Sequence, residues 1–167
     1  MDLLIVRHAR AQDRDDFAST RQPDEKRPLT AKGVRRMKKA ARGLRSLVPS
    51  VGLLVSSKLR RSSQTAKIIA DAYGGIEWIE QERLAPGASP QQLIAWLAAQ
   101  PENETACIVG HEPDLSDLLS LLLAEKKDQP AKLKKGSACL LTFAGPVAAC
   151  AGHLQWYRSA KELASGA

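Results

Sequence analysis

Aromatic residues, cysteines and long apolar runs are all scarce in this chain of 167 residues. Phe, Trp and Tyr make up 4% of it, and its three tryptophans are too scattered to form a stacking ladder for nucleic-acid bases. Apolar stretches such as 118–124 fall far short of the roughly 20 residues that a membrane-spanning helix needs. The three cysteines are odd in number and lack metal-ligand spacing. Cys107 and Cys139 lie in apolar runs, so we expect them to be buried small side chains in a reducing cytoplasm.

We also expect no secretory leader at the N-terminus. Met1 and Asp2 lead directly into an apolar segment, without a basic region or a small-residue cleavage site. Apolar residues make up 44% and charged residues 26%, which is typical of a globular protein. The length predicts one domain, residues 1–167, and we expect it to be cytoplasmic and not bound to a membrane. A net charge of +7 favours anionic partners.

Short apolar runs alternate with segments of helical periodicity along the chain. Strands are predicted at residues 3–6, 53–55, 76–79, 106–109, 137–143 and 153–157. Helices are predicted at 30–47, 61–73, 89–100 and 114–124, the first with Thr30 as its N-cap. Residues 10–28 and 125–136 are polar and are predicted to be loops. This alternation indicates a three-layer α/β/α fold around a mainly parallel sheet.

Ligands of such sheets bind beyond the carboxyl ends of the strands, and charged side chains lie there in this sequence. Arg7 and His8 follow the first strand. Arg60 and Arg61 come shortly after the second, and His111 follows the strand at 106–109. Two of the three histidines are therefore predicted at the functional edge of the sheet.

Two imidazoles and two guanidiniums in one pocket suit phosphoryl transfer. Guanidinium groups bind phosphate oxygens and offset their charge as the group is transferred. A neutral imidazole can attack phosphorus, and a second imidazole, if protonated, can donate to the same oxygens. We expect no metal ion and no cofactor, because the arginines already supply positive charge.

Four ordered blocks of the sequence resemble the histidine phosphatase superfamily, also called phosphoglycerate-mutase-like. Residues 7–11 (Arg-His-Ala-Arg-Ala) match its Arg-His-Gly signature, with Ala in place of Gly. An acidic spacer residue, Asp24, then precedes residues 27–33 (Arg-Pro-Leu-Thr-Ala-Lys-Gly), as in the SixA-type phosphohistidine phosphatase branch. Residues 57–66 resemble the Ser-x-x-x-Arg-Ala-x-Gln-Thr block, and residues 109–113 the Gly-His-Glu-Pro block.

This resemblance implies roles for four residues. His8 is the expected nucleophile, and Arg7, Arg61 and His111 are the expected catalytic phosphate ligands. The register selects Arg61 over Arg60, which we expect to be solvated. Arg27, at the start of the block at residues 27–33, is interpreted as part of a surface ion pair, and Thr30 as a helix start.

The general acid is less well defined. Many members of the family carry an acidic residue after the block that corresponds to residues 57–66, and this residue protonates the leaving oxygen. Glu80, Glu82 and Glu112 are candidates by position. Glu82 is named as the candidate acid, although a solvated charge is the favoured interpretation of this residue. SixA-like members share the short chain without large insertions. Phosphohistidine has a better leaving group than an alkyl ester, so the lack of a clear general acid favours an N-phosphate substrate.

The sequence therefore predicts a metal-independent phosphatase that acts on phosphohistidine in a protein through a phosphohistidine intermediate. Two alternatives stay open. One is a phosphatase for small phosphomonoesters. The other is a binding module without activity, based on the basic face of the first long helix: Arg35, Arg36, Lys38, Lys39, Arg42 and Arg45. Nucleic acid is not the expected partner, because such a run is usually a solvated face.

Overall fold

The computed structural model describes residues 1–102, 104–125 and 132–166, which form a single α/β domain. Six strands make one sheet in the order β3-β2-β4-β1-β5-β6. Their bounds are β1 Asp2–Arg7, β2 Leu53–Ser56, β3 Ile79–Glu80, β4 Thr105–Gly110, β5 Ala138–Thr142 and β6 His153–Arg158. The first four run parallel, whereas β5 is antiparallel to both β1 and β6. The predicted mainly parallel sheet is confirmed.

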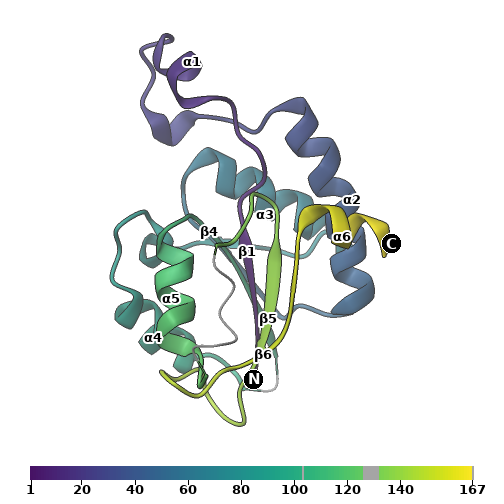
Figure 1. The fold of residues 1–167 in the computed structure, drawn as a ribbon, viewed down its shortest axis with the longest axis vertical. Coiled ribbons are helices and arrows are strands. Elements are labelled where there is room, and N and C mark those ends of the chain that lie inside the picture. The colour runs from purple at the N-terminus through teal and green to yellow at the C-terminus, as the bar shows by residue number, and fades with distance from the viewer. Residues whose placement is uncertain (103, 126–131, 167) are drawn as a thin grey trace.

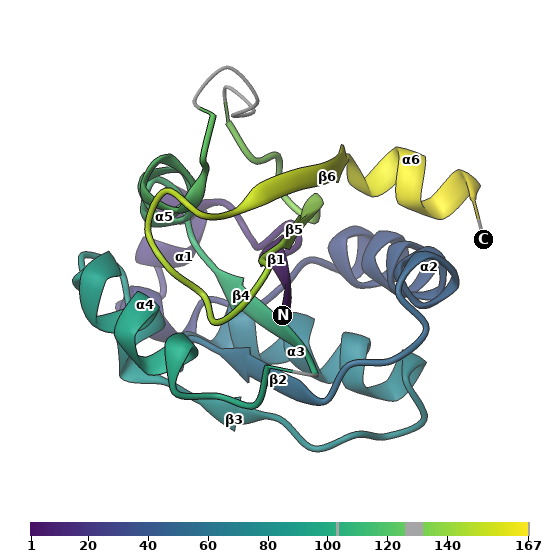
Figure 2. The same cartoon turned by 90° about the horizontal axis from the view of Figure 1, so that it is seen from below.

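Helices cover both faces of this sheet. The helices are α1 Arg14–Ala18, α2 Ala31–Leu47, α3 Arg60–Ala72, α4 Pro90–Ala98, α5 Asp114–Leu122 and α6 Ala160–Ser165. Single 3-10 turns lie at Asp24–Lys26 (η1) and Glu82–Leu84 (η2). In Figure 2, α2 and α3 lie on one side of the sheet, and α4 and α5 lie on the other. Among the described residues, no helix has the length and apolar character needed to cross a membrane.

The alternation of side chains in β1 explains the three layers. Leu4 and Val6 pack into the core with α2 and α3, whereas Leu3 and Ile5 pack into the core with α4 and α5. All four side chains are fully buried, because both faces of the central strand are covered. Cys107 and Cys139 are buried as predicted, one on each side.

The structure differs from the predicted elements at both ends of the chain. The loop expected at 10–28 contains α1, which begins because the Asp13 carboxylate accepts the backbone N–H groups of Asp15 and Asp16. A C-terminal helix, α6, was not predicted. It begins with a capping box between Ser159 and Glu162 and packs on α2. The short strand expected at 76–79 is found at Ile79–Glu80, and part of the loop expected at 125–136 lies outside the described residues.

The segment between β1 and α2 extends beyond the carboxyl end of β1 (Figure 1). It holds α1 and η1 over the edge of the sheet where β1, β2 and β4 end. This arrangement gives the carboxyl edge of the sheet a wall that the strands alone do not supply.

Candidate active site

Parallel pairing of β1 with β4 places His8 beside His111. Arg7 pairs with Gly110 at the ends of the two strands, and the His8 backbone N–H donates to the Gly110 carbonyl at 3.1 Å. Both histidines follow these positions directly. Their ring centroids are 5.1 Å apart, with the ring planes at 51°. Two histidines separated by about a hundred residues in sequence are thus adjacent because their strands are neighbours.

The tautomer of neutral His8 follows from one hydrogen bond. Its Nδ1 lies 2.7 Å from the carbonyl oxygen of Ala9. Because a carbonyl oxygen only accepts, Nδ1 carries the proton, and Nε2 of the neutral ring keeps its lone pair. Burial and the charges of Arg61 and Arg7 together lower the pKa of His8 to about 3, against the opposing effect of the Ala9 hydrogen bond. The ring is therefore neutral at pH 7, with Nε2 available as a nucleophile.

His111 is held from the opposite side by Ser57. Its Nε2 lies 2.9 Å from the Ser57 hydroxyl oxygen, which also accepts the Leu59 backbone N–H at 3.2 Å. Nδ1 of His111 is buried and has no hydrogen-bond partner among the described residues. Burial lowers the pKa of His111 to about 4, and Arg61 and Arg7 act in the same direction. The second imidazole, considered as a cation in the sequence argument, is thus neutral at pH 7 in the ligand-free protein.

Two arginines border the histidines and keep unused donors. Nη1 of Arg7 donates to the Leu133 carbonyl at 2.7 Å. Arg61 lies in the first turn of α3 and is 4% exposed, and its Nη1 is 3.1 Å from Oδ2 of Asp24. In each guanidinium, the Nε–H is buried without a partner among the described residues. A buried donor without a partner is costly, so a bound oxyanion would satisfy both groups.

Polar residues of α3 fix the segments around His8. The Thr65 hydroxyl accepts the Ala9 backbone N–H at 3.1 Å and donates to the Arg61 carbonyl at 2.7 Å. The Gln64 side-chain oxygen accepts the Leu29 backbone N–H at 2.8 Å. The Gln-Thr pair of the block at residues 57–66 thus anchors α3 to both segments that flank α1.

The structure explains why a glycine stands at position 33, the last residue of the block at 27–33. A Cβ atom at this position would lie 2.2 Å from the Arg10 carbonyl oxygen. The same carbonyl accepts the backbone N–H of Thr30 at 2.9 Å, and the Thr30 hydroxyl accepts the Gly33 N–H at 2.9 Å as the N-cap of α2. Glycine therefore allows α2 to begin against the chain that leaves the active site.

An open cavity of about 560 Å³ lies at the carboxyl edge of the sheet. All four residues predicted to bind or transfer phosphate line it: Arg7, His8, Arg61 and His111. Arg60 is exposed, as expected.

The three acid candidates differ in position. Glu82, the residue predicted as general acid, does not line the cavity: its side chain is 87% exposed, and Oε1 lies 3.7 Å from Nζ of Lys58. Glu80 is likewise outside and accepts a hydrogen bond from Ser63. Glu112 does line the cavity, with Oε2 accepting from the Ser116 hydroxyl at 2.7 Å.

Arg27 is not the surface residue that the sequence suggested. It is 8% exposed and lines the cavity, because η1 folds back over α3. Its Nε donates to Oδ1 of Asp24 at 2.7 Å, and its Nη1 donates to the Gln12 carbonyl at 2.7 Å. Asp24 therefore bridges Arg27 and Arg61, a contact that the sequence pattern did not predict.

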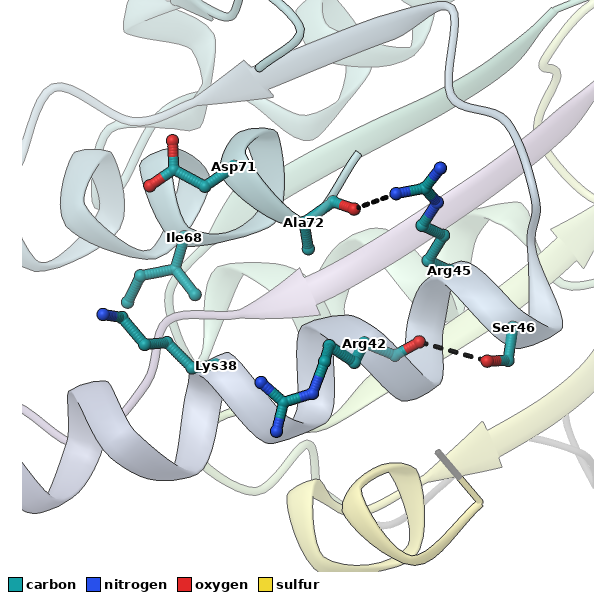
Figure 3. Close-up of a pocket in the computed structure, with 7 residues that line it drawn as sticks. All are labelled: Lys38, Arg42, Arg45, Ser46, Ile68, Asp71 and Ala72. Atoms are coloured by element: carbon teal, nitrogen blue, oxygen red, sulfur yellow. Dashed lines mark hydrogen bonds between the residues drawn. The ribbon is translucent and has the colours of Figure 1, made fainter. Parts of the chain in front are cut away.

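A second hollow, of about 660 Å³, lies between α2 and α3 (Figure 3). Part of the basic face of α2 lines it, namely Lys38, Arg42 and Arg45. Arg45 donates to the Ala72 carbonyl at 2.8 Å, which ties the two helices together. No histidine borders this groove, and its lining comes from the flanks of two helices rather than from the ends of the strands. It is a charged surface groove.

The fold and the cavity define an α/β protein whose cavity at the carboxyl edge of the sheet is lined by two histidines and several arginines. A family model of the histidine phosphatase superfamily (branch 1) matches residues 3–86. An uncharacterised protein of Picosynechococcus sp. is 36% identical over 138 residues, 81% of each chain. An uncharacterised protein of Mycobacterium tuberculosis is 31% identical over 151 residues, 89% of each chain. This chain belongs to the histidine phosphatase superfamily.

Solved structures share this fold over nearly the whole chain. The protein histidine phosphatase SixA in complex with tungstate superposes with a TM-score of 0.81 at 20% identity, covering 98% of this chain and 99% of that one. A putative SixA of Nakamurella multipartitia gives 0.74 at 26% identity and 94% coverage of both chains. A mycobacterial glucosyl-3-phosphoglycerate phosphatase gives 0.69 at 19% identity, with 95% and 98% coverage. The shared fold thus serves phosphatases named for protein and for small-molecule substrates.

Proposed function

We propose that this protein is a phosphatase that transfers the phosphoryl group of phosphohistidine in a protein to Nε2 of His8 and then to water. The observation that carries the proposal is the Nδ1–H bond of His8 to the Ala9 carbonyl at 2.7 Å. It fixes the tautomer that attacks, and it can persist in the phosphorylated ring, because Nδ1 is not the atom that reacts.

The proposed reaction has two displacements. Nε2 of His8 attacks phosphorus, the bond from phosphorus to the substrate nitrogen breaks, and that nitrogen takes a proton from solvent as it leaves. Water then attacks phosphorus, the bond to Nε2 breaks, and inorganic phosphate departs. In both steps, the Nε–H groups of Arg7 and Arg61 are the donors proposed to stabilise the equatorial oxygens.

His111 is proposed to serve the same oxygens. Its buried Nδ1 has no partner among the described residues, whereas Nε2 is occupied by Ser57. Burial and the charges of Arg61 and Arg7 hold the pKa of His111 down, and a phosphoryl dianion in the cavity would oppose the effect of the two charges. Substrate binding therefore favours a protonated His111 that donates from Nδ1. Because three cationic groups then offset the charge, we propose that no metal ion takes part.

The position of the carboxylates supports an N-phosphate substrate. Glu82 lies outside the cavity, and an imidazole leaving group needs less protonation by the enzyme than an alkoxide. One observation favours a second candidate, hydrolysis of small phosphomonoesters: Glu112 lines the cavity and one of its oxygens, Oε1, is buried without a hydrogen-bond partner among the described residues. A carboxylic acid there could protonate an oxygen leaving group.

A phosphoenzyme trap tests the proposal. The protein is mixed with a 32P-labelled phosphohistidine protein, or with acetyl phosphate as a general donor, in the presence of a chelator, and it is quenched in alkali, in which phosphohistidine survives. Label mapped to His8 and lost in His8→Asn is the expected result. Asn is the matched variant, because its amide can still donate to the Ala9 carbonyl.

Other outcomes separate the alternatives. Rapid turnover of phosphomonoesters with no turnover of phosphohistidine would select the small-molecule phosphatase. Wild-type turnover by His8→Asn would overturn the proposed nucleophile. Neither label nor phosphate release from any substrate would leave the binding module of the α2 face as the better description.

A further inference from the structure

A purely cationic hollow adjoins the proposed active site on the side of α2. It has a volume of about 370 Å³. Its charged lining residues are all basic, and the others are glycine, alanine and methionine. The basic residues are Arg7, Arg10, Arg36, Lys134 and Lys135. We call this space the flanking hollow.

The flanking hollow and the catalytic cavity share three of these residues. Arg7, Arg10 and Lys135 line both. The backbone explains this position, since the Gly136 N–H donates to the carbonyls of Arg7 and His8 at 3.1 Å each. The segment that carries Lys135 is therefore held against the end of β1. A single ligand that contacts Arg7 can therefore extend into both the catalytic cavity and the flanking hollow.

The two spaces differ in their acidic residues. Asp13, Asp16 and Glu112 line the catalytic cavity, but no carboxylate lines the flanking hollow. Within the part of the chain that the structure describes, no carboxylate lies within 4.0 Å of a charged nitrogen of Arg10, Arg36, Lys134 or Lys135.

Lys135 is affected by this excess of positive over negative charge. Partial burial and the charges of Arg7, Arg10 and Arg27 lower the pKa of its ammonium group, and only Asp13 opposes them. Like charges held close together without counterions raise the electrostatic energy of the free protein. A bound anion would remove that repulsion.

We propose that the flanking hollow binds a second anionic group of the substrate, a phosphate or a carboxylate that lies next to the phosphoryl group being transferred. This inference rests on the proposed function for the position of that phosphoryl group. Arg10 offers a planar pair of donors and Lys135 a point charge, both suited to phosphate or carboxylate oxygens. The substrate class is thus doubly anionic: a bisphosphorylated or carboxylated small molecule, or a phosphorylated residue with an acidic neighbour.

A binding measurement tests the subsite without relying on catalysis. Methylenebisphosphonate and methylphosphonate, which are not hydrolysed, are titrated into the protein by calorimetry at fixed ionic strength. We expect the bisphosphonate to bind at least tenfold more tightly, on the order expected for one additional charge-assisted contact. In Arg10→Gln/Lys135→Gln the ratio of the two affinities should fall to near one.

The groove of Figure 3 supplies the matched control. Lys38→Gln/Arg42→Gln also removes one lysine and one arginine charge, but from the exposed α2–α3 groove. If the preference comes from a local subsite, this control keeps the wild-type ratio. A wild-type ratio of one, or an equal loss in both double variants, would overturn the proposal in favour of general charge attraction.

Turnover separates this inference from the proposed function and distinguishes the two sources of the anion. Phenyl phosphate, 3-carboxyphenyl phosphate and its neutral 3-carbamoyl analogue form the small-molecule series. Phosphohistidine peptides with Glu or Gln beside the phosphorylated residue form the peptide series. His8-dependent turnover with no preference for the acidic member in either series contradicts the subsite and leaves the phosphatase intact. Absence of turnover together with a preserved bisphosphonate preference contradicts the phosphatase and retains the anion site.

Discussion

Oδ2 of Asp24 lies 3.1 Å from Nη1 of Arg61, while Oδ1 of the same carboxylate accepts from Arg27 at 2.7 Å. One acidic side chain thus holds two buried guanidiniums at the wall of the catalytic cavity. Burial opposes ionisation of Asp24, but the hydrogen bond from Arg27 and the charge of Arg61 lower its pKa. The carboxylate is therefore ionised at neutral pH and orients Arg61 towards the site.

Asp24→Asn should reduce turnover by about tenfold, because Arg61 loses the charged partner that orients it, a contact of about 1.5–3 kcal/mol. Steady-state kinetics with a labile phosphoryl donor measures this. Asp71→Asn is the control: it removes the exposed ion pair with Lys67 at 3.0 Å, elsewhere on α3. Equal activity of the two variants would show that Arg61 holds its position without Asp24.

Thr65 has a comparable role on the other side of His8. Its buried hydroxyl links the Ala9 N–H to the Arg61 carbonyl. Thr65→Val keeps the shape of the side chain but leaves the Ala9 N–H without an acceptor, which costs about 1–3 kcal/mol of unfolding free energy. Urea denaturation should show that loss, and turnover should fall with it.

Thr65→Ser provides the control, because it retains the hydroxyl. It should restore most of the turnover even if the lost methyl group lowers stability. A Ser variant as inactive as the Val variant would mean that packing of the methyl group, rather than the two hydrogen bonds, positions His8.

The sequence predicted the elements that carry the histidines and arginines. Strands such as 3–6 and 106–109 are apolar throughout, which identifies them as buried parallel strands, and parallel strands bring their carboxyl ends to one edge. His8 and His111 could therefore be placed together from sequence. The Ser-x-x-Glu capping box of α6 was also present at Ser159, although its short helix lacks a clear periodic pattern.

The contributions of the loops could not be predicted in the same way. The positions of Arg10, Asp24, Arg27 and Lys135 depend on how irregular segments fold back over α3 and β1. Loop residues follow no periodicity, and their contacts join positions far apart in the chain. Glu82 shows the converse: its position in the sequence suggested an acid, but η2 leaves it in solvent.

Low pH should destabilise the protein through its buried histidines. The pKa of His8 is about 3 in the folded protein, below the value of about 6.5 expected when the chain is unfolded. The unfolded state therefore binds more protons between these values, and stability is lost as the pH falls below 6.5. Between pH 7 and pH 5, His8 alone should account for a loss of about 2 kcal/mol of unfolding free energy.

Urea denaturation at both pH values tests this dependence. His8→Asn should lose less stability than the wild type over the interval, by about the same 2 kcal/mol. The same change at exposed His153 should leave the wild-type dependence unaltered. Identical pH dependence in His8→Asn and the wild type would mean that the site takes up a proton without cost, in conflict with a neutral nucleophile.

The two glutamates decide which class of leaving group the site can serve. Glu112 lines the cavity, whereas Glu82 is exposed beside Lys58. If Glu112 protonates an oxygen leaving group, Glu112→Gln should reduce turnover of alkyl phosphomonoesters by about a hundredfold, the usual scale of general acid catalysis. Turnover of phosphohistidine should change little, because imidazole leaves more readily. Glu82→Gln should alter neither rate.

The test is the ratio of alkyl phosphomonoester turnover to phosphohistidine turnover, rather than either rate alone. A fall in both rates in Glu112→Gln would indicate a disturbed cavity, since Glu112 also accepts from Ser116 at 2.7 Å. Glu112→Asp keeps the acid but shortens its reach, so a selective loss of the alkyl ester rate there as well would support proton donation at a fixed distance. A large effect of Glu82→Gln would require η2 to move over the cavity when substrate binds.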